Sequence, residues 1–331
     1  MKRLLIAALC LISSAHSYAY DKPYIGEVRT INAAYDDTLS YLARDYNLGY
    51  LELLSANQNV DPWMPGEGTE ITLPARHILP DAPHNGIVIN LAEMRLYAYL
   101  DSDLAPVTYP LGIGREGLET PTGQTHIRYK MAGPTWRPTA RMREEEPSLP
   151  AEVGPGYENP LGTHALYLGW PEYLIHGTNR PFGIGRRVSS GCIRMYPEAI
   201  TKLFEIIDTG TAVNVIDQPI KAAWIDDTLY IEAHTNLKQS IEREDGNTIT
   251  PSPLTYDEIQ YIKRIAGDEA DTIDWDIINK IVLKRNGMPM PALTRKTDAK
   301  KAPQAEEPQS KDTEKDILTT AQNANRLNIN N

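Results

Sequence analysis

RVSSGCIRM, residues 187–195, surrounds Cys192, the cysteine on which our interpretation of this chain depends. The chain has 331 residues and two cysteines, and the other one, Cys10, lies in an apparent signal peptide. Exported proteins usually pair their cysteines in disulfides, so a single remaining thiol has no partner within the chain. Two interpretations are open, a buried inert cysteine or a reactive nucleophile.

A histidine sixteen residues earlier favours the nucleophile: His176 opens the segment His176-Gly177-Thr178-Asn179. A cysteine nucleophile needs a base, thiolate character and donors for the oxyanion that forms on the attacked carbonyl. We therefore assign Cys192 as nucleophile and His176 as its base. The carbonyl of Gly177 can orient the imidazole, Gly191 allows close approach of the substrate, and the backbone N–H of Cys192 is an oxyanion donor.

Two polar residues flank the nucleophile. Ser190 and Arg194 can hold a carboxylate or a peptide carbonyl, although Arg194 as a structural ion-pair residue is an open alternative. His164, in a neighbouring predicted strand, is interpreted as a structural histidine rather than a cleft residue. The remaining histidines have no ligand-like spacing and there is no second mature cysteine, so we expect neither a metal site nor a cofactor.

The N-terminus is typical of a secretory signal. Lys2 and Arg3 precede a short apolar stretch, and Ser17-Tyr18-Ala19 is a small-x-small cleavage site. We expect cleavage near Ala19, a periplasmic location and no integral membrane segment, because the apolar stretch is too short to span a bilayer. The formal charge of −11 becomes −13 without Lys2 and Arg3, which argues against nucleic acid as a partner.

The length predicts more than one domain. Residues 20–80 read as a β-α-α-β unit, with strands at 25–31 and 70–74 and helices starting at Asp37 or Thr38 and covering 48–57. Residues 85–217 are β-rich, with a long proline-containing loop at 133–162 and one clear helix at 197–208, whose apolar face includes Ile206.

The remainder is predicted to be a short α-rich extension and a tail. Residues 218–294 contain two expected helices, one after the capping box formed by Thr255 and Glu258 and one from about Trp275 to Arg285. Residues 295–331 contain no aromatic residue and are strongly polar. We expect this tail to be disordered, because it cannot bury enough apolar surface to offset its ordering entropy.

Four segments together resemble the YkuD-type L,D-transpeptidase family in its Gram-negative periplasmic branch. They are residues 176–179, residues 189–195, Thr120-Pro121-Thr122-Gly123 and residues 159–166. The resemblance spans residues 85–217 and implies a mainly β, β-sandwich-like catalytic domain with Cys192 as nucleophile and His176 as base. It further implies that the Gly177 carbonyl orients the imidazole, and we place Thr178 with Ser190 and Arg194 among the substrate-binding residues. Ser190 stands where many members carry histidine, a substitution common in this branch.

Residues 20–80 resemble a LysM domain. The matching segments are Asp37-Thr38-Leu39, residues 53–57, and Pro65-Gly66 before the strand at 71–74. This resemblance implies binding to the N-acetylglucosamine-containing glycan of peptidoglycan. Asp36 replaces the glycine that usually precedes Asp-Thr-Leu, and a spacer that binds nothing is the alternative.

The family resemblance implies a reaction. Cys192 would attack the carbonyl of the third residue of a peptidoglycan tetrapeptide stem and expel D-alanine. The acceptor would be a diaminopimelate amine, giving a 3-3 cross-link, or the lysine of an outer-membrane lipoprotein. The same residues would serve an L,D-carboxypeptidase or a lipoprotein-releasing hydrolase that uses water, and a non-enzymatic cell-wall scaffold is a third reading. The sequence leaves the acceptor and the oligomeric state open.

Overall fold

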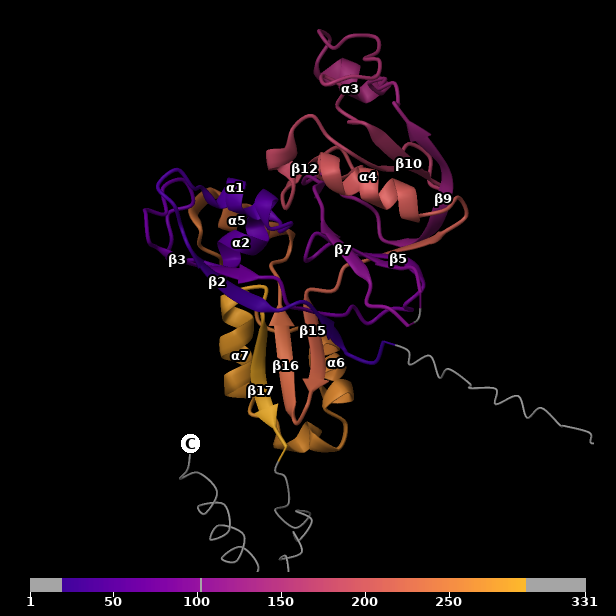
Figure 1. The fold of residues 1–331 in the computed structure, drawn as a ribbon. Coiled ribbons are helices and arrows are strands. Elements are labelled where there is room, and N and C mark those ends of the chain that lie inside the picture. The colour runs from indigo at the N-terminus through magenta and orange to yellow at the C-terminus, as the bar shows by residue number, and fades with distance from the viewer. Residues whose placement is uncertain (1–19, 102, 296–331) are drawn as a thin grey trace, which may run out of the picture. The chain divides into compact units, whose positions relative to one another are not determined.

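The computed structural model describes residues 20–101 and 103–295, and its largest element is an eight-stranded mixed sheet (Figure 1). The strand order is β13-β11-β10-β9-β14-β5-β6-β7. The predicted signal peptide and residues 296–331 of the predicted tail lie outside the described residues. The strands of this sheet are β5 (Gly86–Asn90), β6 (Arg95–Tyr99), β7 (Val107–Pro110), β9 (Gly123–Ala132), β10 (His164–Leu168), β11 (Leu174–His176), β13 (Ile193–Arg194) and β14 (Ala212–Ile216).

The centre of the sheet is apolar on both faces. Every residue of β5 is buried, and β5 pairs in parallel with β14 and antiparallel with β6. Such a strand reads as a continuous apolar run because both of its faces are covered. A separate parallel pair, β8 (Ile113–Gly114) with β12 (Arg187–Ser189), leads the chain towards Cys192.

Helix α4 (Pro197–Ile206) packs against β10. Proline stands at its first turn, where a missing N–H costs no hydrogen bond, and Ala199, Ile200 and Leu203 form its buried face. The helix ends two residues earlier than predicted. Ile206 is 40% exposed, so its expected place on the apolar face was wrong.

Residues 20–80 contain the strands and helices of the expected order: β2 (Val28–Asn32), α1 (Leu39–Asp45), α2 (Tyr50–Ala56) and β3 (Glu70–Pro74), with β2 antiparallel to β3. The short strands β1 (Tyr24–Ile25) and β4 (His77–Ile78) pair beside them. The side chain of Thr38 accepts a hydrogen bond from the Tyr41 N–H and caps α1.

The first turn of α2 docks on the chain that leads to Cys192. The N–H groups of Tyr50 and Leu51 donate to the carbonyl oxygens of Ile184 and Gly185, at 3.3 and 3.2 Å. Gly49, the N-cap, has no side chain for this purpose, so a distant segment satisfies these donors. The apolar residues of α1, α2 and β3 belong to the same hydrophobic core as those of the large sheet.

The C-terminal extension differs from the expected segment with two helices. Within residues 218–295 the structure has a three-stranded antiparallel sheet and three α-helices, and the sheet and the last two helices share a core of their own. The strands are β15 (Ile220–Ile225), β16 (Thr228–Ala233) and β17 (Pro289–Thr294), and the helices are α5 (Leu237–Gly246), α6 (Tyr256–Ala266) and α7 (Trp275–Lys284). Helix α5 was not predicted, because its buried residues are polar and give no apolar periodicity. They are Gln239, Ser240 and Arg243.

Candidate active site

Cys192 lies at the end of a tight turn, immediately before β13. Strand β13 runs parallel to β11, with Ile193 opposite Ile175 and Arg194 opposite His176, so the predicted nucleophile and base belong to neighbouring strand ends. Gly191 has a φ of +107°, and an added Cβ would lie 3.0 Å from the ring of Tyr173. Glycine is therefore required at this position by both conformation and space.

Two hydroxyl groups hold this turn. The Ser189 hydroxyl donates to the carbonyl oxygen of Cys192 and accepts from the Gly191 N–H, at 3.1 Å for the second contact. The Thr120 hydroxyl donates to the carbonyl oxygen of Gly191 at 2.8 Å and accepts from the Gly114 N–H at 3.0 Å. The functions of Ser189 and Thr120 could not be predicted from the sequence, because spacing alone does not reveal the hydrogen-bond partners of a hydroxyl group.

His176 is buried, and its Nδ1 lies 2.6 Å from the carbonyl oxygen of Gly177. A carbonyl oxygen only accepts, so Nδ1 carries the proton and Nε2 keeps its lone pair. Burial, together with the positive charge of Arg194, lowers the pKa of His176 to about 3, while the carbonyls of Gly177 and Leu161 act in the opposite direction. The imidazole is therefore neutral at neutral pH and able to accept a proton.

The thiol of Cys192 is also neutral at rest. Its Sγ donates to the carbonyl oxygen of Glu172 at 3.3 Å. Burial raises the pKa of Cys192, although the charge of Arg194 and a backbone hydrogen bond from Leu174 oppose that shift. The resting pair is a thiol and an imidazole, not a thiolate and an imidazolium, so thiolate character must arise when the base removes the proton.

Both residues line a cleft of about 630 Å³. One wall comes from the predicted long loop, which forms the short helix α3 (Ala140–Glu145) and contributes Trp136, Arg141 and Met142. The neck of that loop is fixed by the buried Asn159, whose side-chain amide donates to the carbonyls of Pro134, Val153 and Gly154. A cleft of this size accommodates a peptide-sized ligand.

The structure brings four of the predicted site side chains together: Cys192, His176, Ser190 and Arg194 all line the cleft. Thr178 is buried outside the lining, where its hydroxyl accepts from the Arg180 N–H at 2.9 Å and shapes the turn after β11. His164 lies apart from the cleft lining, with its ring against Phe204 and its Nδ1 near the hydroxyl of Thr163.

Arg194 has no carboxylate partner among the residues that the structure describes, and its Nε is buried without a hydrogen bond. Burial lowers the pKa of Arg194, and the nearby guanidinium groups of Arg180 and Arg115 lower it further, against the opposing effect of Cys192. A structural ion-pair role therefore finds no counterion in the described part of the chain. An uncompensated guanidinium beside the nucleophile suits an anionic ligand.

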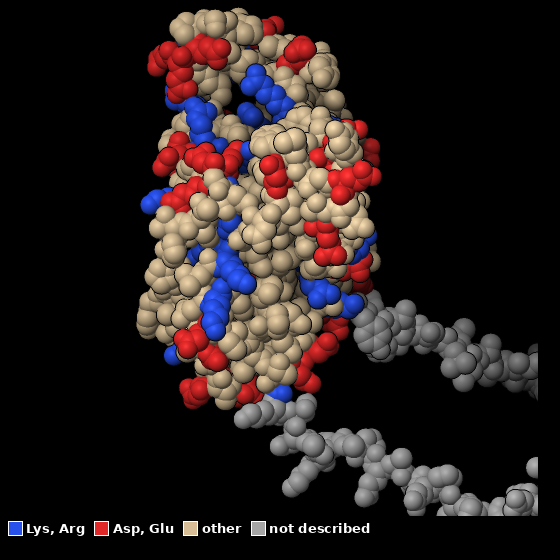
Figure 2. All heavy atoms as spheres, turned by 90° about the vertical axis from the view of Figure 1, so that its left-hand side faces the viewer, with Lys and Arg blue, Asp and Glu red and all other residues tan. Residues whose placement is uncertain are grey.

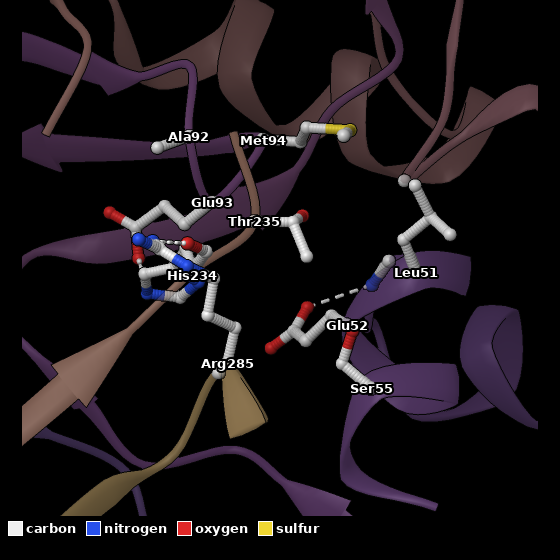
Figure 3. Close-up of a pocket in the computed structure, with 12 residues that line it drawn as sticks. Leu51, Glu52, Ser55, Ala92, Glu93, Met94, His234, Thr235 and Arg285 are labelled. Carbon is white, nitrogen blue, oxygen red and sulfur yellow. Dashed lines mark hydrogen bonds and ion pairs between the residues drawn. The ribbon is translucent and has the colours of Figure 1, made fainter. Parts of the chain in front are cut away.

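A second, small cavity of about 20 Å³ lies where three parts of the chain meet (Figure 3). Glu52 comes from α2, Glu93 from the turn between β5 and β6, and His234 and Arg285 from the C-terminal extension. The nucleophile and its base are absent from the lining of this cavity. Its ionic groups connect the N-terminal unit and the extension to the large sheet.

Next to this cavity, His77, Glu93 and Glu232 place their possible ligand atoms within 4.8 Å of one another. The ammonium group of Lys221 lies among them, 2.6 Å from Glu93 Oε2, 2.7 Å from Glu232 Oε1 and 2.7 Å from the carbonyl oxygen of Ile78. This cation already pairs with both buried carboxylates and lies where a metal ion would have to lie, so we assign the cluster a structural role.

No helix within the described residues is long and apolar enough to cross a membrane.

Comparisons with known proteins show the family of this chain. The family model YkuD, described as the L,D-transpeptidase catalytic domain, matches residues 84–215. The probable L,D-transpeptidase YbiS of Escherichia coli (strain K12) is 39% identical over 307 residues, which cover 88% of this chain and 98% of YbiS. The probable L,D-transpeptidase YcfS of the same organism is 42% identical over 262 residues, covering 76% of this chain and 79% of YcfS.

More distant proteins match a smaller share of the chain. The putative L,D-transpeptidase YkuD of Bacillus subtilis (strain 168) is 30% identical over 54% of this chain and 93% of its own length. The solved catalytic domain of the Enterococcus faecium L,D-transpeptidase covers 41% of this chain and all of that domain, with 20% identity and a TM-score of 0.33. The match to YbiS over nearly its full length confirms the resemblance drawn from the four segments: this chain belongs to the YkuD family of L,D-transpeptidases.

Proposed function

We propose that this L,D-transpeptidase acts through an acyl-enzyme on Cys192, formed with the third residue of a peptidoglycan tetrapeptide stem. The observation that carries the proposal is the contact between His176 Nδ1 and the Gly177 carbonyl, since it leaves Nε2 free as a base in the cleft that Cys192 lines. The neutral states of both groups support a proton transfer that accompanies attack.

The protons balance over two half-reactions. The thiol turns from the Glu172 carbonyl to His176 Nε2, which takes its proton as sulfur attacks the stem carbonyl. The backbone N–H of Cys192 stabilises the oxyanion. When the intermediate collapses, the imidazolium returns the proton to the departing amine of D-alanine. An acceptor amine then attacks the thioester, His176 removes its proton, and the thiol is restored when the thioester bond breaks.

Arg194 and Ser190 are proposed to position the donor. A tetrapeptide ends in a D-alanine carboxylate next to the attacked bond, and the guanidinium of Arg194 lies in the cleft without a carboxylate partner among the described residues. A charge-assisted hydrogen bond to this carboxylate would hold the carbonyl over Cys192.

The proposed location is the periplasm. The signal peptide is proposed to direct export and to be cleaved near Ala19. The proposed acceptor is a diaminopimelate amine, which gives a 3-3 cross-link, or the lysine of an outer-membrane lipoprotein. Residues 20–80 are proposed to act as a LysM-like glycan-binding unit. Their strands and helices follow the β-α-α-β order, and Tyr35, Trp63 and Met64 are exposed on the loops after β2 and α2.

The test begins with the acyl-enzyme. Purified protein is incubated with a carbapenem, and intact mass is expected to show one stoichiometric adduct that Cys192→Ala lacks. With a disaccharide tetrapeptide the wild type is expected to release D-alanine. His176→Gln is expected to lose about 10²- to 10⁴-fold in rate. An adduct that persists in Cys192→Ala would refute the assignment.

The acceptor is tested in a deletion strain. Loss of 3-3 muropeptides would support diaminopimelate as acceptor, and loss of covalently bound lipoprotein would support lysine. Release of free tripeptide by the purified enzyme in the presence of both amines would favour the carboxypeptidase instead.

A further inference from the structure

A second hollow adjoins the catalytic cleft. It has a volume of about 640 Å³ and shares a wall with the cleft, formed by Trp136, Met142, Pro160, Ser190 and Arg194. We call it the arginine chamber, because it is lined by Arg115, Arg180, Arg186 and Arg194. Figure 2 shows a hollow bordered by basic side chains near the upper end of this face.

The positive charge of the arginine chamber is only partly balanced. Arg186 has its own partner, Glu244 of α5, and lies over the ring of Tyr50. Arg115 lies 3.4 Å from Glu145 of α3, which also binds Arg141.

Two arginines in the chamber have no such counterion. Arg180 is exposed, and neither Arg180 nor Arg194 has a carboxylate partner within residues 20–101 and 103–295. Glu146, the other acid in the lining, accepts from the hydroxyl of Ser148. The four guanidinium groups thus have three carboxylates near them, Glu145 and Glu146 in the lining and Glu244 outside it, and the buried Nε of Arg194 has no hydrogen bond. Guanidinium groups gathered in this way are a binding site for a carboxylate.

The chamber adjoins the cleft that Cys192 lines. Arg115 donates to the Ser190 hydroxyl at 3.3 Å, and Ser190 stands two residues before Cys192. Arg194 stands two residues after Cys192, in the wall common to both hollows. A carboxylate held between Arg180 and Arg194 would therefore lie beside the thioester.

The proposed reaction indicates which ligand would carry that carboxylate. The first half-reaction expels D-alanine, an amine with a carboxylate on the adjacent carbon. Attack by the acceptor amine retraces this departure, so it passes through an intermediate of the same geometry. An acceptor with a carboxylate in the same place would use the same contacts, whereas an amine without one would leave the guanidinium groups unpaired.

We propose that the arginine chamber is the leaving-group and acceptor subsite, and that it selects amines bearing a carboxylate on the adjacent carbon, with Arg180 as a specificity residue. This inference rests on the proposed acyl-enzyme at Cys192. In the transfer step the nitrogen of the acceptor forms the new amide bond, the carbon–sulfur bond of the thioester breaks, and the proton of the amine passes through His176 to the sulfur. The D-centre of diaminopimelate has this arrangement of groups, whereas in a C-terminal lysine the reacting amine and the carboxylate are separated by the side chain.

The experiment compares two small acceptors, D-methionine and D-methioninamide, on enzyme charged with a tetrapeptide donor. The new amide products are quantified by mass spectrometry as a function of acceptor concentration. The wild type is expected to prefer the acid in kcat/KM, and Arg180→Gln is expected to lose about 10-fold or more of that preference through a higher KM for the acid. The amide serves as the internal reference in each variant. Arg137→Gln is the matched control, because Arg137 is an exposed arginine that pairs with Glu152 and is not part of the chamber lining.

The outcomes separate the two proposals. Equal use of acid and amide by the wild type, or an unchanged preference in Arg180→Gln, would overturn the arginine chamber as a carboxylate subsite while leaving the acyl-enzyme intact. Better use of Nα-acetyl-lysine than of D-methionine would reassign the chamber to lysine-terminated acceptors. Failure of the tetrapeptide to acylate Cys192 would remove the proposed function and this inference with it.

Discussion

The imidazole Nδ1 of His176 lies 2.6 Å from the carbonyl oxygen of Gly177, its neighbour in the chain. Because this contact fixes the proton on Nδ1, it gives the buried histidine a defined tautomer, which is the one that the proposed base requires. The partner of Nδ1 is a backbone carbonyl and not a third side chain. It depends on the backbone turn after β11, where the Gly177 N–H donates to the carbonyl oxygen of His164 at 3.1 Å.

The first prediction concerns pH. Protonation of His176 would remove the base, and burial holds its pKa at about 3, so this loss occurs as the pH falls through about 3 and not through 6.5. The raised pKa of Cys192 keeps the thiol protonated at neutral pH. The rate of carbapenem acylation is therefore expected to be flat between about pH 5 and 8. Stopped-flow fluorescence across this range checks it, and an inflection near 6.5 would contradict the neutral pair.

The second prediction concerns the turn that presents Cys192. Thr120→Val removes a hydroxyl that bonds both Gly191 and Gly114 while keeping the side-chain volume. We expect acylation to slow by about 10- to 100-fold, since small displacements of a nucleophile cost that much. Thr122→Val, at an exposed position two residues away, is the control and is expected to match the wild type. A Thr120→Val enzyme with normal kinetics would show that the turn keeps its conformation without the Thr120 hydroxyl.

The third prediction compares two ion pairs made by residues 20–80, one with Arg95 of β6 in the large sheet and one with Glu198 of α4. The carboxylate of Glu52 lies 2.5 Å from the guanidinium of Arg95 and both are buried, whereas Arg44 and Glu198 form a pair at 3.2 Å that is largely exposed. Glu52→Gln leaves a buried guanidinium without its counterion, so unfolding should become easier by about 3–5 kcal/mol.

Glu198→Gln provides the matched control for that pair. Its exposed partner remains solvated, so a change of about 0–1 kcal/mol is expected. Urea denaturation of the three proteins measures the difference. Equal stability of both variants would show that the buried pair contributes no more than the exposed one to the attachment of the N-terminal unit.

These contacts show where sequence reasoning succeeds and where it stops. The helix that begins at Pro197 and the presence of Cys192 and His176 in one cleft could be predicted, because short local patterns indicate them, and the catalytic roles of the two residues stay a prediction. The contacts that join residues 20–80 to the rest of the chain could not be predicted. Glu52 and Arg95 are 43 residues apart, and the carbonyls that cap α2 come from Ile184 and Gly185. Residues 20–80 read as a separate module in the sequence, yet they share one core with the sheet and hold the segment leading to Cys192.

The burial of polar side chains is a second feature that could not be predicted from the sequence. Helix α5 was missed because its buried face is polar, and the same face contacts β12, the strand before Cys192: the hydroxyl of Ser240 accepts from Arg187 at 3.0 Å. Thr120 bonds Gly191 across 71 residues. Hydroxyl groups are frequent on every surface, so only the fold reveals which of them support the nucleophile.

The fourth prediction concerns Arg194. If its guanidinium holds the D-alanine carboxylate of the donor, the wild type should prefer a tetrapeptide over a pentapeptide, whose additional residue moves the carboxylate away. Arg194→Lys should lose activity almost as far as Arg194→Ala, because an ammonium cannot form the same pair of parallel hydrogen bonds. Rates on both donors, with circular dichroism as a check on folding, test it. Wild-type rates and donor preference in both variants would rule out the clamp.

The fifth prediction concerns the exposed apolar side chains of residues 20–80. Tyr35 is 82% exposed and Trp63 is 63% exposed, and the carboxylate of Asp61 fixes the second loop by accepting from the N–H of Trp63 at 2.8 Å. An ordered loop that presents an indole to solvent is suited to stacking on a sugar ring, in agreement with the proposed glycan binding.

Tyr35→Ala combined with Trp63→Ala should weaken cosedimentation with intact sacculi by about 10-fold or more, the loss expected from removing aromatic anchors. Acylation by a carbapenem should stay unchanged, because neither side chain lines the cleft. Tyr256→Ala is the control, since Tyr256 is 74% exposed at the start of α6 in a different part of the chain. If the double variant sediments like the wild type, residues 20–80 serve to support the segment before Cys192 and not to bind glycan.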